Sequence, residues 1–431
     1  MGLGITHGGC DSKGLSTLQF FLSRWKGAVG DCAFQSSHLL SQTMAVRART
    51  RLLALVTMGT VAFSLNGEFA RASSDSTLES TKQEGALVIY SSTSGKFARN
   101  VVEEFKSLYP GIAVTYLSLA PAEIDARVRQ EAATSSGPDV VWSSAMDLQM
   151  KAVRDGLALP YKSPEASSLP KWATWRDRLF ATTYEPIVIV YNRQLLRGSD
   201  IPTTHRQLRE LLVSHRDKYC GKVSTYAIPN AEVGAVALRF DAEYDPKFWR
   251  MAEAMGAIDV DTEASSASMI ERVRTGQSLI AYNVAGGEAI RRARRDPLIG
   301  VQFTLDYNLV LSRLMFISKS TRHPNAARVW VDFILSKRGQ QQMQVADLFP
   351  LREDVEGTDP GITLLRRTRG IARPIVLDEK LAYVATTKAA NAFLGRWQQT
   401  IKSSARPCSN APVVERARAL PNITRALPSH G

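Results

Sequence analysis

One part of the chain alternates strand and helix patterns, and this alternation limits the possible folds more than any other feature of the sequence. Short apolar runs rich in strand-forming residues lie at 86–90, 112–117 and 138–144. Helical patterns lie between them at 97–108 and 121–133. A series of strand, helix, strand, helix and strand predicts a doubly wound parallel sheet with flanking helices. The predicted fold class is therefore α/β.

Hydroxyl-bearing side chains follow two of these strands. Ser92, Thr93 and Ser94 come after the first strand, and Ser143 and Ser144 end the third. In open α/β sheets, ligands bind beyond the carboxyl ends of the strands. Hydroxyls and backbone N–H groups at a helix N-terminus can hold an anion there, but the same serines also serve as ordinary helix caps. The sequence leaves both interpretations open.

The length of 431 residues suggests two domains and enough material for a core. Residues 187–190 form a further buried-strand pattern with Tyr184 before it, and residues 309–317 form a β run. Beyond them, the C-terminal end mixes proline, serine, arginine and asparagine with few apolar side chains. We therefore expect a disordered tail at 401–431.

Residues 44–72 have the three-part pattern of a secretory signal peptide. Arginines form its positive region, residues 52–65 form its apolar region, and a small-residue cleavage site ends at Ala72. The apolar run is short for a membrane span. We expect export, cleavage near Ala72 and a periplasmic location, with residues 1–43 a spurious or disordered leader. In that oxidising compartment Cys220 and Cys408 could pair.

No constellation of residues indicates an enzyme or a metal site. The mature chain has no Gly-x-Ser-x-Gly elbow, and the histidines lack metal-ligand spacing. The segment 91–96 lacks the first glycine and the final hydroxyl of a phosphate-binding loop. We therefore expect no catalytic residues, no metal and no cofactor.

The formal net charge of +13 favours anionic partners, unless the basic side chains are spread over a solvated surface. The basic residues are mixed with acidic ones and lack interleaved aromatic residues, so we expect no nucleic-acid partner.

Several phrases in order along the chain resemble the family-1 extracellular solute-binding proteins, which are periplasmic components of ABC transporters. These phrases are "GALVIYSSTSG", "GPDVVWSS", "IVIVYN", "AYNVAGGEAIRRARRDP" with "DYNLVLSRLMFISK", and "HPNAARVWVDFILSKRGQ". The resemblance covers about residues 84–350 and lies in the branch that holds ferric-iron binders and binders of phosphorylated solutes. It implies a monomer that closes on a small solute and delivers it to an inner-membrane permease.

The resemblance also implies a type II periplasmic-binding-protein fold, in which each of two lobes is a doubly wound sheet with flanking helices and a hinge lies between them. The segments "ATTYEPIVIVYN" and "FTLDYNLVLSRLMFI" would cross between the lobes. The expected parts are an N-terminal lobe of residues 73–184 and 308–400, and a C-terminal lobe of residues 185–307.

The choice of solute depends on Tyr282 and Asn283. Ferric binders of this branch carry two adjacent tyrosines at the corresponding place, whereas this chain has one tyrosine and an amide. The resemblance therefore implies a small anionic organic solute, such as a phosphorylated sugar or a phosphoglycerate-like compound. Two functions remain as alternatives: a ferric-iron-binding protein and a ligand-sensing partner of a membrane histidine kinase. This chain has Gly287-Glu288 where the resemblance leads us to expect Ser-Tyr, and a carboxylate at Glu288 does not favour an anion site nearby.

The remaining candidate contacts come from the strand ends and the crossings. Tyr282 is a ligand contact or an aromatic that fills the sheet end. Most of the four arginines that follow, Arg291, Arg292, Arg294 and Arg295, are expected to point to solvent or to a partner. Arg313 lies inside a buried strand run and needs a partner, either Asp306 or the ligand. The full set of candidate ligand-binding residues is Ser92, Thr93, Ser94, Ser143, Ser144, Tyr184, Asn230, Tyr282, Asn283, Gly286, Gly287, Asp306 and Arg313.

Overall fold

The computed structural model describes residues 81–134, 136–228, 232–356, 359–368 and 370–408. All of them belong to one of the two compact units of the chain, Asp75–Gly431; the other unit is Met1–Ser74. The predicted leader and signal peptide therefore lie outside the described residues, and so does Asn230. No helix within the described ranges is long and apolar enough to cross a membrane.

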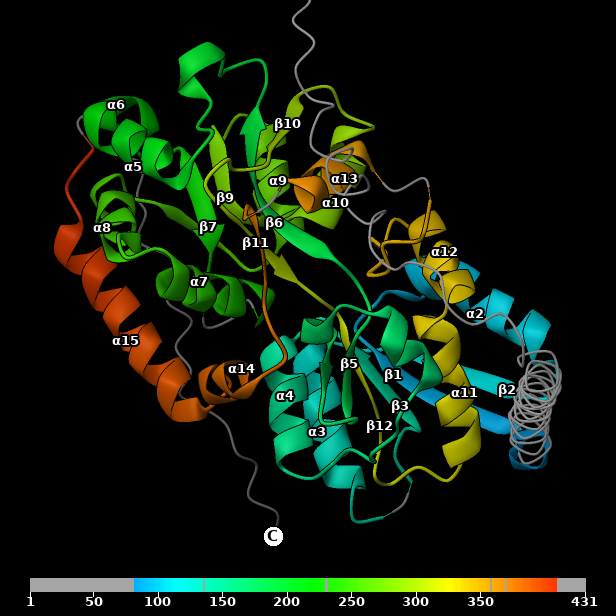
Figure 1. Ribbon diagram of the computed structural model, residues 1–431. Coiled ribbons are helices and arrows are strands. Elements are labelled where there is room, and N and C mark those ends of the chain that lie inside the picture. The colour runs from blue at the N-terminus through cyan, green and yellow to red at the C-terminus, as the bar shows by residue number, and fades with distance from the viewer. Residues whose placement is uncertain (1–80, 135, 229–231, 357–358, 369, 409–431) are drawn as a thin grey trace, which may run out of the picture. The chain divides into compact units, whose positions relative to one another are not determined.

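Thirteen named strands in the described residues form two mixed sheets (Figure 1). The first sheet has the order β2-β1-β3-β12-β5-β4; the second has the order β13-β11-β6-β9-β7-β8, and β10 also pairs with β6. The strands are β1 Ala86–Ser91, β2 Ala113–Ser118, β3 Val140–Ser143, β4 Thr174–Trp175, β5 Leu179–Ala181, β6 Glu185–Asn192, β7 Val223–Tyr226, β8 Asp261–Glu263, β9 Ile280–Ala285, β10 Ile299–Gln302, β11 Asn308–Leu311, β12 Leu314–Ile317 and β13 Ala372–Pro374.

Helices connect and flank these strands. The α-helices are α2 Gly95–Leu108, α3 Pro121–Glu131, α4 Met146–Arg154, α5 His205–Ser214, α6 Arg216–Tyr219, α7 Glu232–Tyr244, α8 Phe248–Ala257, α9 Ser266–Arg274, α10 Gly286–Ala293, α11 Pro324–Leu335, α12 Lys337–Val345, α13 Pro360–Arg367, α14 Glu379–Val384 and α15 Thr387–Ser404. Three short 3-10 helices are η1 Pro164–Ser168, η2 Lys171–Ala173 and η3 Gly198–Asp200.

The first sheet follows the predicted alternation of strand and helix. β1 pairs in parallel with both β2 and β3, and α2 and α3 connect these strands. The helical spacing of α2 is the reason it packs here, because Ala98, Val101, Val102 and Phe105 all lie on its buried face. The predicted α/β class with two sheets is confirmed. β12 adds an antiparallel strand beside β3, which a parallel-sheet prediction alone does not contain.

The second sheet is built around β6. β9 and β11 pair with β6 in antiparallel fashion, while β7 pairs in parallel with β9 and with β8. Val188 and Val190 of β6 and Val284 of β9 are buried in the hydrophobic core of this sheet. The register between β6 and β9 shifts between Val188 and Val190, and Asn283 has a φ of 64°. This irregularity redirects the side chains at the end of β9.

The chain passes between the two sheets at two places that define the later site. β5 belongs to the first sheet and β6 to the second, so the short segment before Glu185 is one crossing. β11 belongs to the second sheet and β12 to the first, so Ser312 and Arg313 form the other. The predicted single β run at 309–317 is therefore two strands in different sheets.

The expected boundaries of the two lobes differ from the sheet membership. The sequence predicts that residues 308–400 belong to the N-terminal lobe, whereas β11 and β13 pair within the second sheet. The reason is that β11 continues the edge of β6 through hydrogen bonds that a sequence pattern does not reveal.

The C-terminal part of the chain is ordered further than expected. The tail prediction began at 401, but α15 continues to Ser404 and packs on α8 (Figure 1). Gly256 of α8 lies directly against Ile401, and a Cβ at that position would come within 2.6 Å of the Ile401 carbonyl oxygen. Cys220 and Cys408 then form a disulfide. The apolar contacts and this bond explain why residues 401–408 do not form a tail; residues 409–431 lie outside the described ranges.

Candidate functional site

Two adjoining cavities lie where the two sheets meet. They have volumes of about 230 and 210 Å³ and share Glu185, Ala285 and Arg313. The first cavity is also lined by Ser144, Tyr226, Val233, Ala264, Ser265, Ser266, Leu311 and Ser312. The second is also lined by Ser92, Thr93, Ser94, Phe97, Gly287, Glu288, Arg291, Asp347, Leu348 and Phe349.

The first sheet contributes hydroxyl groups at the ends of β1 and β3. Ser94 caps α2 by accepting a hydrogen bond from the backbone N–H of Lys96. The Ser92 hydroxyl accepts a hydrogen bond of 2.9 Å from the Ser144 backbone N–H, and the two serine hydroxyls lie 3.2 Å apart. The serine-rich loops are therefore tied together, because parallel neighbouring strands bring their carboxyl ends to the same edge.

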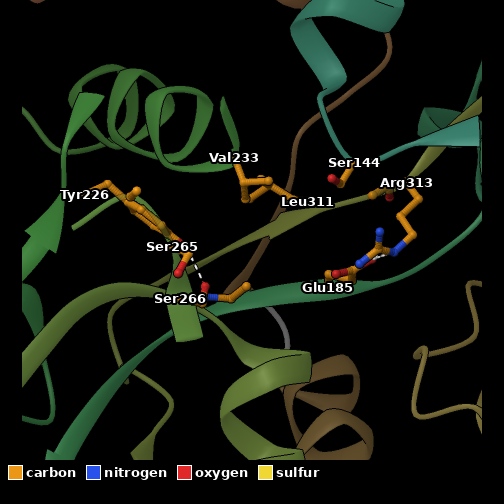
Figure 2. Close-up of a pocket in the computed structure, with 11 residues that line it drawn as sticks. Ser144, Glu185, Tyr226, Val233, Ser265, Ser266, Leu311 and Arg313 are labelled. Atoms are coloured by element: carbon orange, nitrogen blue, oxygen red, sulfur yellow. Dashed lines mark hydrogen bonds and ion pairs between the residues drawn. The ribbon is translucent and has the colours of Figure 1, made fainter. Parts of the chain in front are cut away.

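The second sheet contributes a tyrosine and two serines on the opposite side of the first cavity (Figure 2). Tyr226 ends β7, and Ser265 and Ser266 lie at the N-terminus of α9. The Tyr226 and Ser266 hydroxyls are 2.5 Å apart, and Ser266 also accepts a 3.1 Å hydrogen bond from the Ala285 backbone N–H. Burial raises the pKa of Tyr226 to about 12, so this side chain is a neutral phenol at physiological pH.

Arg313 and Glu185 face each other at the junction of the two cavities (Figure 2). Arg313 Nε lies 3.0 Å from Glu185 Oε1, and its N–H does not align with that oxygen, so the contact is an ion pair rather than a hydrogen bond. Arg313 Nη1 donates to Thr93 Oγ1 at 3.1 Å. Thr183 Oγ1 donates to Glu185 Oε1 at 2.8 Å. Arg313 lies in the crossing between β11 and β12, and Glu185 begins β6 directly after the crossing from β5.

The second cavity contains a further arginine. The Arg291 guanidinium carbon lies 4.3 Å from the centre of the Phe97 ring, so α10 contacts α2 through a cation–π interaction. Arg291 also forms an ion pair with Glu288, and Arg292 Nε lies 3.1 Å from the same carboxylate. Arg291 is an exception to the expectation that most of these arginines point to solvent, because its side chain is only 13% exposed. These two arginines neutralise Glu288, the carboxylate that did not fit an anion site.

This arrangement can hold a small anionic group. The N-terminus of α9 borders the first cavity and that of α2 borders the second, and each offers hydroxyls and backbone N–H groups. Arg313 lines both cavities. A guanidinium in a partly desolvated cavity forms charge-assisted hydrogen bonds with carboxylate or phosphate oxygens. Leu311, Val233 and Ala285 supply an apolar surface for the rest of a solute.

Tyr282 and Asn283 lie elsewhere, around the buried carboxylate of Asp241 on α7. The Tyr282 hydroxyl donates to Asp241, Asn283 Nδ2 donates to the same carboxylate at 2.9 Å, and Tyr307 donates at 2.5 Å. Asp241 is completely buried. Burial, followed by the charge of Asp241, raises the pKa of Tyr282 well above its ordinary value. These side chains line neither cavity and satisfy one another instead.

Asp306 pairs with His205, not with Arg313. His205 Nδ1 lies 2.9 Å from Asp306 Oδ1, and the His205 ring stacks on Tyr307 with centroids 4.0 Å apart. Burial alone would lower the pKa of His205, but the hydrogen bond to Asp306 and the charge of Asp241 raise it above its ordinary value. Arg313 therefore pairs with Glu185 and not with Asp306, one of the two partners that the sequence left open for it.

Three further candidates are also placed outside the two cavities. Ser143 is buried, and its hydroxyl accepts from the Ala145 backbone N–H. Gly286 packs tightly against Pro186, since a Cβ there would come within 2.6 Å of the Pro186 carbonyl oxygen. Tyr184 lines a separate cavity of about 220 Å³, where the Arg366 guanidinium lies 4.5 Å from the centre of its ring. The candidates that do line the two cavities are Ser92, Thr93, Ser94, Ser144, Gly287 and Arg313.

The sequence reasoning missed Glu185, Tyr226, Ser265, Ser266 and Arg291. A signal existed for the serine pair, because Ser265 and Ser266 follow a strand and begin a helix in the same way as the serines after β1. No comparable signal exists for Glu185, since its role depends on the position of Arg313 more than a hundred residues later. Within the described ranges, no group of three or more histidine, cysteine, aspartate or glutamate residues could hold a metal ion.

The model of the family described as bacterial extracellular solute-binding protein matches residues 91–341, which is more than half of the chain. A solved substrate-binding protein of an ABC transporter from Agrobacterium tumefaciens is 29% identical, with a TM-score of 0.67; the match covers 73% of this chain and 94% of that one. No curated protein matches the sequence.

More distant structures share the fold. AfuA from Actinobacillus pleuropneumoniae, solved with fructose-6-phosphate, is 15% identical with a TM-score of 0.59, and the match covers 74% of this chain and 99% of that one. Iron-bound HitA from Pseudomonas aeruginosa is 15% identical with a TM-score of 0.58, and the match covers 73% and 99%. Because an iron binder and a sugar-phosphate binder match equally well, the fold alone does not select the solute.

Proposed function

Because this chain belongs to the family of bacterial extracellular solute-binding proteins, we propose that it captures a small organic solute with an anionic group in the two cavities between its sheets. The solute is then delivered to an inner-membrane ABC permease. The chain acts as a monomer in the periplasm and binds its solute without transforming it.

The observation that carries this proposal is the position of Arg313. Its guanidinium borders both cavities, next to hydroxyls from both sheets. The crossings from β5 to β6 and from β11 to β12 lie next to this point, so a solute bound there touches each sheet and two of the segments that join them. Such a position couples binding to closure, as hinge-closing binders require.

The donor set favours an organic solute over ferric iron. The first cavity offers one phenol, Tyr226, which is engaged with Ser266, together with neutral serine hydroxyls and a single carboxylate, Glu185, which pairs with Arg313. Tyr282, the candidate phenolate, donates its proton to Asp241 away from both cavities. Hydroxyls, helix N-termini and a guanidinium match the oxygen atoms of a phosphate, phosphonate or carboxylate.

The test is a thermal-shift screen of the mature chain, followed by calorimetric titration of the compounds that bind. The panel contains organic phosphates, phosphonates and carboxylates, with and without amino groups, together with neutral sugars and ferric citrate. We expect at least one organic anion to raise Tm, since a ligand that binds only the folded state stabilises it. A panel in which no organic anion raises Tm would contradict the proposal.

The variant Arg313→Ala tests whether the solute binds in the two cavities. It should weaken affinity by about 30-fold or more, as expected when a charge-assisted hydrogen bond is lost. The matched control is Arg206→Ala, which removes an arginine whose side chain is 73% exposed on α5. If the two variants bind the solute equally well, the site is not at Arg313.

A further inference from the structure

The charged groups that line the two cavities do not favour a simple anion. They are two guanidinium groups, Arg291 and Arg313, and three carboxylates, Glu185, Glu288 and Asp347. Two of these carboxylates are already paired: Glu288 with Arg291 and Arg292 on α10, and Asp347 with Arg294, the residue that follows α10. The third, Glu185, lies beside Arg313 at the junction of the two cavities.

Glu185 keeps one carboxylate oxygen available. Its contacts with Thr183 and Arg313 both involve Oε1, and no described residue donates a hydrogen bond to Oε2. The side chain is 15% exposed and borders both cavities. A largely buried carboxylate with a free oxygen favours a cationic partner.

Arg313 keeps one nitrogen that can donate a hydrogen bond to a solute. Nη1 donates to Thr93 and Nε lies at Glu185, whereas no described residue accepts a hydrogen bond from Nη2. The junction therefore offers a free acceptor with negative charge beside a free donor with positive charge. An anion bound to Arg313 alone would lie close to the Glu185 carboxylate and be repelled by it.

We infer that the solute is a small zwitterion, whose phosphate, phosphonate or carboxylate group is held by Arg313 and the nearby hydroxyls and whose ammonium group is held by Glu185. This inference rests on the proposed capture of an anionic solute and adds the positive group. Glu185 is then a specificity-determining residue that selects amino-substituted anions over their analogues without the amino group.

The experiment compares matched pairs of compounds by calorimetric titration at pH 7. The pairs are 2-aminoethyl phosphate with ethyl phosphate, 2-aminoethylphosphonate with ethylphosphonate, and β-alanine with propionate. In at least one pair, the amino compound should bind the wild-type protein at least about ten-fold more tightly, the size of one charge-assisted hydrogen bond. The pair with the highest affinity identifies the anionic group.

The variant Glu185→Gln tests whether Glu185 causes this selectivity. Glutamine keeps the shape and an oxygen that can accept from Thr183, so the preference should fall below about three-fold while the analogue without the amino group binds more tightly than before. The matched control, Glu104→Gln, removes a carboxylate that pairs with Arg338 outside both cavities and should keep the wild-type preference. Equal binding of both members of each pair to the wild-type protein would overturn the zwitterion but leave anion capture intact. Failure of every amino compound to bind would also overturn the zwitterion, and anion capture would fall with it only if no organic anion of the thermal-shift panel raised Tm.

Discussion

Two polar clusters lie along β9, one at its middle and one at its carboxyl end, and they differ in whether their hydrogen bonds are satisfied internally. The cluster around Asp241 uses Tyr282 and Asn283 of β9, and three donors give both oxygens of its carboxylate a hydrogen bond. The cavity cluster begins where β9 ends at Ala285. In this cluster Arg313 keeps a free hydrogen-bond donor, and Glu185 keeps a free acceptor oxygen. The buried cluster therefore stabilises the fold, whereas the cavity cluster can bind a solute.

The difference shows that residue type alone does not identify a binding site. Tyrosine, asparagine and aspartate are typical ligand contacts, but here they satisfy one another in a fully buried position. Serines and one ion pair, which are less conspicuous in the sequence, border the open volume instead. Four predictions separate the two clusters.

Asp241→Ala is expected to have the largest effect. It leaves three buried donors without an acceptor, and breaking such a network costs about 3–5 kcal/mol of the free energy of unfolding. Urea unfolding followed by circular dichroism measures this loss. Asp241→Asn, which keeps the shape and one acceptor oxygen, should lose less. A loss below about 1 kcal/mol for the alanine variant would show that the cluster does not stabilise the fold.

Tyr307→Phe should affect stability without affecting binding. It removes one donor to Asp241 but keeps the ring that stacks on His205, so we expect a loss of about 1–2 kcal/mol in the free energy of unfolding. The affinity for the best-binding compound of the panel should stay within about two-fold of wild type. A large loss of affinity with unchanged stability would reverse the roles of the two clusters.

Tyr226→Phe is the matching change in the cavity cluster. It removes the hydroxyl beside Ser266 and keeps the buried ring, so affinity should fall about three- to ten-fold while the free energy of unfolding changes by less than about 1 kcal/mol. Calorimetric titration and urea unfolding measure the two quantities on the same sample. Unchanged affinity would remove Tyr226 from the site.

The pH dependence of stability should originate in the buried cluster. The pKa of His205 is raised in the folded state, so its contribution is fully present below the unfolded pKa of about 6.5 and is lost as pH rises through the higher folded value. The pKa of Asp306 is lowered, because the hydrogen bond and charge of His205 outweigh the effect of burial. Its contribution is present above the unfolded pKa and is lost as pH falls through the lower folded value.

Urea unfolding of wild type and His205→Gln across pH 5–9 measures this linkage. The wild-type protein should lose stability relative to the variant as pH rises above 6.5. Parallel curves for the two proteins would mean that His205 does not titrate differently in the folded state.

The sequence by itself determined the local elements and the class of fold. The apolar spacing of α2 and the strand patterns of β1, β2 and β3 predicted the first sheet, because side-chain periodicity is a local property. The hydroxyl-rich loops Ser92–Ser94 and Ser144 followed from the general position of ligands at the carboxyl ends of strands, and they do line the cavities.

Only the tertiary structure decided which polar residues face the open volume. Tyr282 and Asn283 turn to Asp241 because a register shift between β6 and β9 redirects the end of the strand. Arg313 meets Glu185 and not Asp306 because the run at 309–317 divides between two sheets. Strand registers and crossings arise from hydrogen bonds between segments far apart in the chain, and these pairings leave no periodic signal in the sequence of either partner.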